Sequence, residues 1–125
     1  MAFKSHLKAI LIPLVICQLT IDNATSQTPG RRYWPVSVDS LATGKVPHTH
    51  VQTVGRVRLI RRELDGDWHL KLTGVRGFVI LEIIPGLPLP LPKVGDRIRA
   101  FGIEREDHEH QWIELHPLEK WEPAP

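Results

Sequence analysis

The sequence predicts an all-β protein, a small five-stranded barrel that is preceded by a signal peptide and a flexible arm. Three observations support this prediction. Short segments of alternating apolar and polar residues follow one another from residue 50 onward, turn-forming Gly, Asp and Pro residues separate them, and no segment shows the spacing of an amphipathic helix. The chain has 125 residues, which is room for one domain and an export signal.

The first 26 residues have the order of a secretory signal peptide. Lys4 and Lys8 precede an apolar run over residues 9–19, and small residues that include Ala24 and Ser26 follow it. The run is about half as long as the roughly 20 residues that a membrane-spanning helix needs, so no stable membrane span is expected. We therefore expect cleavage near Ser26 and a secreted or periplasmic mature protein.

Cysteine usage agrees with export. Cys17 is the only cysteine and lies within the signal, so the mature domain has neither a disulfide nor a thiolate. A lipid-attachment cysteine would follow a small residue, and Ile16 stands there instead. The sequence therefore favours a cleaved signal over a lipoprotein, and it offers no cysteine for nucleophilic catalysis.

Residues 27–47 separate the signal from the domain. They contain Gly, Pro, Ser and Thr without sustained periodicity, which predicts a flexible arm. The barrel domain is then expected over residues 48–122, as a monomer.

Two strands joined by a tight turn begin the domain. Residues 50–62 alternate between apolar and polar side chains, and Gly55 is the natural place for a bend in this strand. An Asp-Gly turn at 65–66 leads into residues 68–72, which alternate again and direct Trp68 toward the core.

The other three strands are predicted over residues 78–84, 97–103 and 111–116. The first of them is rich in β-branched residues and has Glu82 as its one polar residue, so we expect it near the centre of the core. Residues 85–92 hold four prolines and should be extended, without a helix. Pro117 is expected to end the last strand or to place it at an edge.

Five short strands in about 70 residues predict a closed barrel, because closure removes exposed strand edges. We expect an OB-like barrel. Its first strand should pair with the second, the second with the third, and the fifth should close against the first.

Several motifs are similar to those of a poorly characterised family of small secreted bacterial OB-fold domains. They are Thr49-His50-Val51, Asp65-Gly66-Asp67 with Trp68-His69, Glu82-Ile83-Ile84-Pro85, Val94-Gly95-Asp96, and Trp112-Ile113-Glu114-Leu115-His116-Pro117. The resemblance covers roughly residues 47 to 121. It implies the OB fold and carries no particular activity with it.

Strand parity places four polar residues opposite the apolar faces of three strands. These candidate metal ligands are His69, Glu82, Glu114 and His116. Two imidazoles and two carboxylates suit zinc or another divalent ion. The four residues form no compact metal motif, so a hydrogen-bonded network or plain solvent exposure is the alternative interpretation. We expect His69 to contact Glu82.

Further histidines lie at 108 and 110, within a polar loop, and at 48 and 50. Loop polarity explains the first pair without a metal. No nucleophile elbow or comparable serine motif is present to support covalent catalysis.

A second candidate site is basic and aromatic. Strand parity turns five residues outward, where OB barrels bind single strands with cations and stacking rings: Arg56, Arg58, Arg97, Arg99 and Phe101. Against nucleic acid stand the acidic carboxyl end and the export signal. The net charge of +2 falls to near zero once the signal is removed, so charge alone identifies no partner.

The sequence therefore predicts an exported binding module without catalysis, for an oligonucleotide, an oligosaccharide or a protein surface. A metal-dependent hydrolase or nuclease that uses the His/Glu set is the first alternative. A structural or interaction protein of the cell envelope is the second.

Overall fold

The computed structural model describes residues 30–125; the predicted signal peptide and the first residues of the predicted arm lie outside this range. Within it, the elements are β1 (Trp34–Pro35), α1 (Val38–Ala42), β2 (His50–Arg62), β3 (Trp68–Thr73), β4 (Phe78–Ile83), β5 (Arg97–Asp107) and β6 (Trp112–Pro123). Among the described residues, no helix has the length and apolar character to cross a bilayer.

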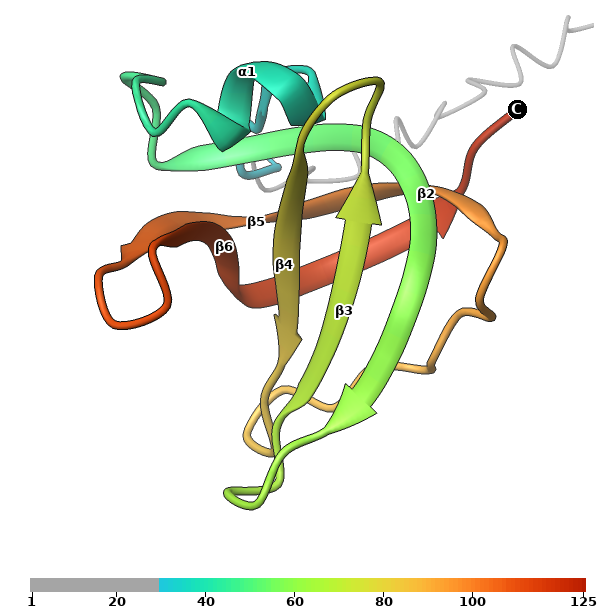
Figure 1. Ribbon diagram of the computed structural model, residues 1–125. Coiled ribbons are helices and arrows are strands. Elements are labelled where there is room, and N and C mark those ends of the chain that lie inside the picture. The colour runs from blue at the N-terminus through green and yellow to red at the C-terminus, as the bar shows by residue number, and fades with distance from the viewer. Residues whose placement is uncertain (1–29) are drawn as a thin grey trace, which may run out of the picture. The chain divides into compact units, whose positions relative to one another are not determined.

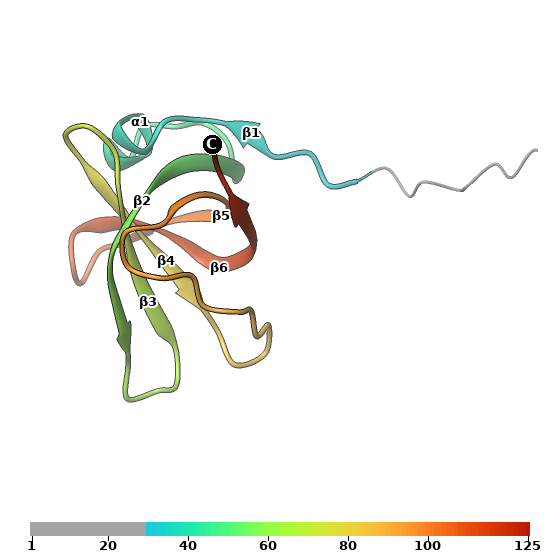
Figure 2. The same ribbon diagram turned by 90° about the vertical axis from the view of Figure 1, so that its right-hand side faces the viewer.

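Strands β2 to β6 form a closed five-stranded OB-like barrel, which confirms the predicted fold class (Figures 1 and 2). β2 pairs with β3 and β3 with β4, both antiparallel. The expected closure of the fifth strand against the first is wrong. β5 pairs with β2 instead, and β6 lies between β4 and β5, parallel to β4.

β2 closes the barrel because it pairs with two strands along different parts of its length. Residues 50–56 pair with β5 and residues 56–62 pair with β3. The register shifts between Val57 and Leu59, just beyond Gly55, where the bend was expected. A Cβ atom on Gly55 would lie 2.7 Å from the Thr73 carbonyl oxygen, so only glycine allows β2 and β3 to approach this closely.

The barrel interior is filled by aliphatic side chains that the strands present at alternate positions. The fully enclosed strand residues include Val51, Val57, Leu70, Leu72, Val79, Leu81, Ile98, Ala100, Leu115 and Leu118. Trp68 packs against this core but is only partly buried. Trp68 therefore lies on the core-facing side of its strand, as expected, although it is near an end of the barrel wall.

The predicted arm needs correction, because its described part packs on the barrel. β1 pairs with the start of β2, and α1 contributes Val38 and Leu41 to the core. Ser37 caps α1 by accepting a hydrogen bond from the Ser40 amide. A helix of five residues is too short to show a periodicity of 3.6, which is why the sequence pattern missed it.

Asp39 in α1 fastens the helix to the β3–β4 turn. Its carboxylate accepts hydrogen bonds from the amides of Gly77 and Arg76, at 2.9 and 3.1 Å. These two amides hold the pKa of Asp39 below its usual value, with the Gly77 bond as the larger cause.

The last two strands are longer than predicted. β5 continues to Asp107 and β6 runs past Pro117 to Pro123. Pro117 does not end the strand because the β5–β6 register shifts around Gly102, so a residue without an amide donor is accommodated at the irregularity. A side chain on Gly102 would lie 2.7 Å from the Pro117 carbonyl oxygen.

The proline-rich connection between β4 and β5 contains no helix, as predicted. It lies against β6, where the Trp121 indole donates a hydrogen bond of 2.7 Å to the Pro90 carbonyl. Leu89 packs against the core and Pro92 is buried.

We predict that Gly77→Ala destabilises the barrel by displacing α1. The added Cβ would lie 2.9 Å from the Ala42 Cβ, and overpacking of this kind costs about 1–3 kcal/mol. Gly86→Ala is the matched control, because its Cβ would meet no atom within 4 Å; its effect should stay within about 0.5 kcal/mol. Urea denaturation of both variants measures the difference, and equal losses would contradict the packing of α1 on this turn.

Candidate functional site

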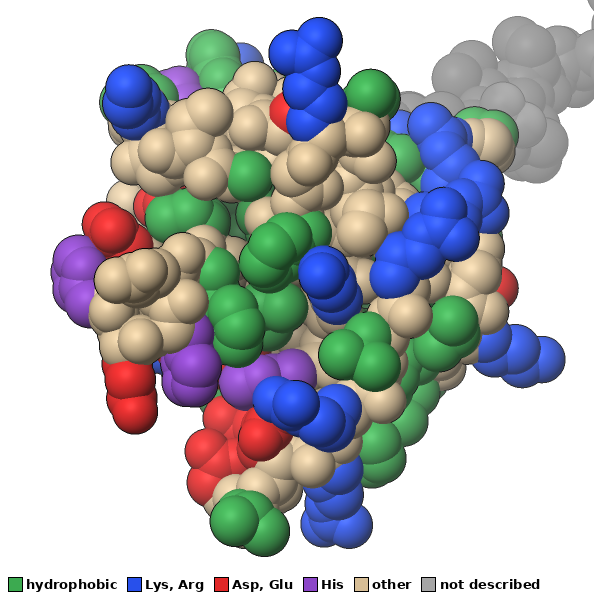
Figure 3. Space-filling view, viewed as in Figure 1, with side chains coloured by type: hydrophobic (Ala, Val, Ile, Leu, Met, Phe, Trp, Pro, Cys, Tyr) green, Lys and Arg blue, Asp and Glu red, His purple; other side chains and the backbone are tan. Residues whose placement is uncertain are grey.

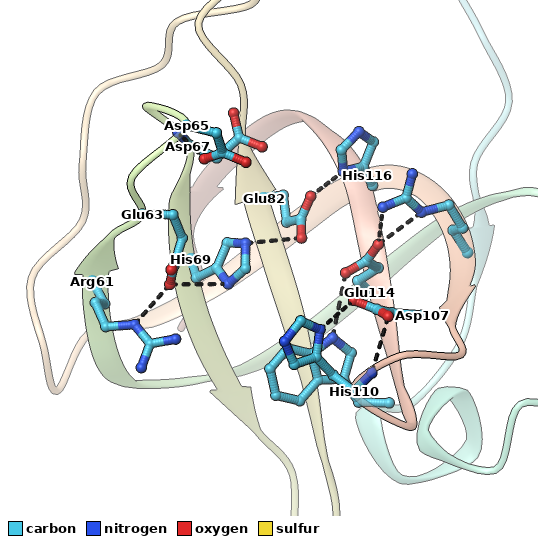
Figure 4. Close-up of polar contacts among 12 residues, drawn as sticks. Arg61, Glu63, Asp65, Asp67, His69, Glu82, Asp107, His110, Glu114 and His116 are labelled. Carbon is cyan, nitrogen blue, oxygen red and sulfur yellow. Dashed lines mark hydrogen bonds and ion pairs between the residues drawn. The ribbon is translucent and has the colours of Figure 1, made fainter.

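The Glu82 carboxylate stands between two histidines on the outer surface of the barrel wall (Figure 4). His69 Nε2 lies 2.9 Å from Glu82 Oε1, and His116 Nδ1 contacts Glu82 Oε2. The first contact follows from the β3–β4 register, which pairs His69 with Glu82, as expected from the sequence. The second follows from the parallel pairing of β4 with β6, which the sequence did not predict.

Glu114, the fourth predicted residue, belongs to a separate set of contacts. Its Oε1 pairs with the Arg105 guanidinium and its Oε2 accepts a hydrogen bond of 3.3 Å from the Trp112 indole. These partners occupy both oxygens and satisfy the buried carboxylate. The structure thus brings all four predicted residues to one side of the wall but gives Glu114 a different partner.

The two glutamates lie on the face opposite the core, as expected from strand parity, but neither is exposed to solvent. Glu82 is 4% exposed and Glu114 is fully buried. Period-two alternation correctly assigned them to the face opposite the core, but it does not tell what covers that face. Here Trp112 and Arg105 contact Glu114, and the histidines contact Glu82.

Burial perturbs the Glu82 carboxyl. Desolvation raises the pKa of Glu82 above its usual value, the neighbouring Glu114 carboxyl raises it further, and His116 opposes both. A carboxyl group in such an environment needs a proton or a cation to be stable when buried.

Asp67 completes the cluster, and the sequence interpretation missed it. Ligand atoms of Asp67, Glu82 and His116 all lie within 4.8 Å of one another. Asp67 ends the β2–β3 turn, where its amide donates to Asp65 Oδ1 and its carbonyl accepts from the Glu63 amide. A turn residue has no strand parity, and the only sequence signal was the Asp-Gly-Asp motif.

His69 links the cluster to the end of β2. Its Nδ1 faces Glu63 Oε1 at 3.4 Å, which is an ion-pair distance without the alignment of a hydrogen bond. Glu63 in turn accepts a bond of 2.7 Å from the Arg61 guanidinium. The imidazole thus has a carboxylate on each side, with the closer contact at Glu82.

An apolar hollow of about 150 Å³ adjoins the cluster. Its lining residues come from β2, β3, β4 and the start of β6: Leu59, Arg61, His69, Lys71, Phe78, Ile80 and Trp112. Phe78 and Trp112 meet edge to face at 6.5 Å, and the Lys71 ammonium lies 4.2 Å from the Phe78 ring centre. Figure 3 shows hydrophobic, histidine and acidic side chains side by side on this face of the molecule.

The predicted basic and aromatic site is only partly assembled. Arg56, Arg58 and Arg97 line a hollow of about 310 Å³ beside α1. Arg99 lies elsewhere and bonds to the Gln52 side chain. Phe101 is not an outward stacking platform, because it is only 7% exposed and Tyr33 packs edge-on against it.

The loop histidines do not form a cluster with each other. His110 stacks on Trp112 with ring centres 4.5 Å apart and pairs with Asp107, whereas His108 is exposed beside Glu106. His48 stacks on Trp34. His110 and His48 are thus each held by a neighbouring aromatic ring, whereas His108 is not.

No protein-family model matches the chain, and no curated protein matches it either. The similarity to secreted OB-fold domains therefore stays a prediction, and the site must be interpreted from its own chemistry.

We predict that the His110 imidazole titrates above its ordinary pKa of about 6.5. The Asp107 carboxylate, 2.7 Å from Nδ1, raises the pKa of His110 by stabilising the protonated ring. Asp107→Asn should lower the midpoint measured by NMR, whereas Asp65→Asn, in another turn, should leave it unchanged. A midpoint that Asp107→Asn does not move would show that the pair does not form in solution.

Proposed function

We propose that the chain is an exported OB-fold module that binds a single-stranded oligonucleotide on the outer face of β2, β3 and β4. The observation that carries this proposal is the apolar hollow with Trp112 and Phe78 in its lining and Arg61 and Lys71 beside them. In OB barrels that bind single strands, aromatic rings stack on the bases and neighbouring cations bind the phosphates.

The position of the hollow supports the proposal. OB barrels bind polymers on the face of their second and third strands and with the loops that follow the first and fourth strands. β3 and β4 are those strands here, and the β2–β3 and β5–β6 turns lie beside them. The hollow has a volume of about 150 Å³, which accommodates one base ring at a time.

Charge favours a nucleic acid over a neutral oligosaccharide. The Arg61 side chain is 60% exposed, and Lys71 reaches over the Phe78 face. A sugar polymer would use the same rings but gain nothing from the cations, so its binding would be insensitive to salt.

The β2–β5 side of the barrel offers a weaker binding surface. Arg56 donates to the Gly95 carbonyl at 2.7 Å and Phe101 is covered, so cations are present there without an exposed ring.

A hydrolase would need a metal ion near the proposed binding face. His69 both lines the hollow and contacts Glu82, so such a site would adjoin it.

Binding of a fluorescent oligothymidylate, followed by anisotropy, tests the proposal. Trp112→Ala should weaken binding about tenfold, since stacking is worth about 1–3 kcal/mol per base. Trp34→Ala is the matched control, because Trp34 is 46% exposed on β1, away from the hollow. Thermal unfolding of both variants shows whether they remain folded.

The affinity should also fall as salt rises, because phosphate contacts release counterions. Undetectable binding, equal losses in the two tryptophan variants, or a preference for a neutral oligosaccharide that is insensitive to salt would each overturn the proposal.

A further inference from the structure

Three donor groups, two carboxylates and one imidazole, converge at one end of the barrel wall. The turn before β3 supplies the Asp67 carboxylate, β4 supplies Glu82, and β6 supplies the His116 imidazole, with ligand atoms within 4.8 Å of one another. Two ligands at about 2.1 Å from one ion are at most about 4.2 Å apart, so the three side chains must adjust slightly to share one ion, and His116 must turn from its direct contact with Glu82 Oε2.

Asp67 is well placed to make its part of this adjustment. Asp67 is partly exposed, while two backbone hydrogen bonds, of 3.0 and 2.8 Å, fix its main chain. Rotation about its side-chain bonds can thus adjust the carboxylate without moving the strands.

The charges around these groups favour a cation. Among residues 30–125, no lysine or arginine forms an ion pair with Asp67 or Glu82; Arg105 pairs with Glu114 instead. Glu82 is 4% exposed, and the imidazoles of His69 and His116 contact its two oxygens. A divalent ion would supply the positive charge that this cluster of carboxylates lacks.

We propose that Asp67, Glu82 and His116 bind one divalent transition-metal ion. A set of two carboxylates and one imidazole suits zinc, which takes three protein ligands where a fourth position stays open to water. Magnesium and calcium need about six or more oxygen ligands and fit this set less well. The His116 side chain is 27% exposed, which gives the ion a path from solvent.

His69 and Glu114, which the sequence also predicted as metal ligands, would not bind this ion directly. His69 Nε2 lies 2.9 Å from Glu82 Oε1 and holds this side of the carboxylate, while the ion would replace the direct contact between Glu82 Oε2 and His116 Nδ1. Glu114 is held by Arg105 and Trp112 and has no free oxygen for the ion. The site stands on this geometry alone and does not depend on what binds in the hollow.

Calorimetry of the protein, stripped with EDTA and titrated with zinc chloride, tests the proposal. We expect one ion per chain, and a loss of affinity of more than about 100-fold in both Asp67→Asn and His116→Gln. His69→Gln should lose about 10-fold and keep the stoichiometry, as expected for a positioning residue. Magnesium chloride should bind more weakly than zinc.

Asp65→Asn is the matched control. It neutralises a neighbouring aspartate in the same turn, yet it keeps the oxygen that accepts the Asp67 amide, so zinc affinity should not change. The double variant His108→Ala/His110→Ala removes the exposed loop histidines and should also leave the affinity unchanged.

Thermal unfolding gives a second readout that separates ligand loss from misfolding. Zinc should raise the melting temperature of the wild type and of Asp65→Asn, but not that of Asp67→Asn, while all three should unfold cooperatively in EDTA. No zinc binding by the wild type, full binding by Asp67→Asn or His116→Gln, or loss of binding only in the loop-histidine variant would overturn the proposed site.

Discussion

The double pairing of β2 determines how the barrel is built. Because the first half of β2 pairs with β5 and its second half pairs with β3, both edges of β2 are occupied. The remaining position for β6 is between β4 and β5. It pairs parallel with β4, and Glu114 is the cross-strand partner of Ile80. Two residues farther on, His116 and Glu82 are level as well. The contact between them is thus a consequence of how the barrel closes.

The two buried glutamates show two ways to satisfy a carboxylate. Glu114 is paired with a permanent cation, Arg105, and with the indole of Trp112, so it resembles a structural ion pair. Glu82 has imidazoles at both of its oxygens and, among the described residues, forms no ion pair with a lysine or arginine. A buried carboxylate without a permanent counter-charge responds to protons and cations, which is why the candidate chemistry centres on Glu82 and not on Glu114.

Sequence periodicity predicted the strands and their faces, and with them the contact between His69 and Glu82. It could not predict what covers a face, so the burial of Glu82 and the covering of Phe101 by Tyr33 were beyond its reach. It also says nothing about turn residues such as Asp67. Which strands pair to close the barrel depends on contacts between residues distant in sequence. The expected pairing of the last strand with the first placed His116 away from Glu82, although the alternation of both strands was predicted correctly.

His69 joins the two proposed sites physically. Its ring lies edge-on to Trp112, with centres 6.4 Å apart, and it lines the hollow, while its Nε2 lies 2.9 Å from Glu82 Oε1. A base stacked on Trp112 would press against the same ring that orients the Glu82 carboxylate. Displacement of that ring changes the direction of the carboxylate, and a metal ion on Glu82 would in turn hold the ring in place. Since coupling of this kind is reciprocal, an ion that tightens oligonucleotide binding must itself be bound more tightly when the oligonucleotide is present.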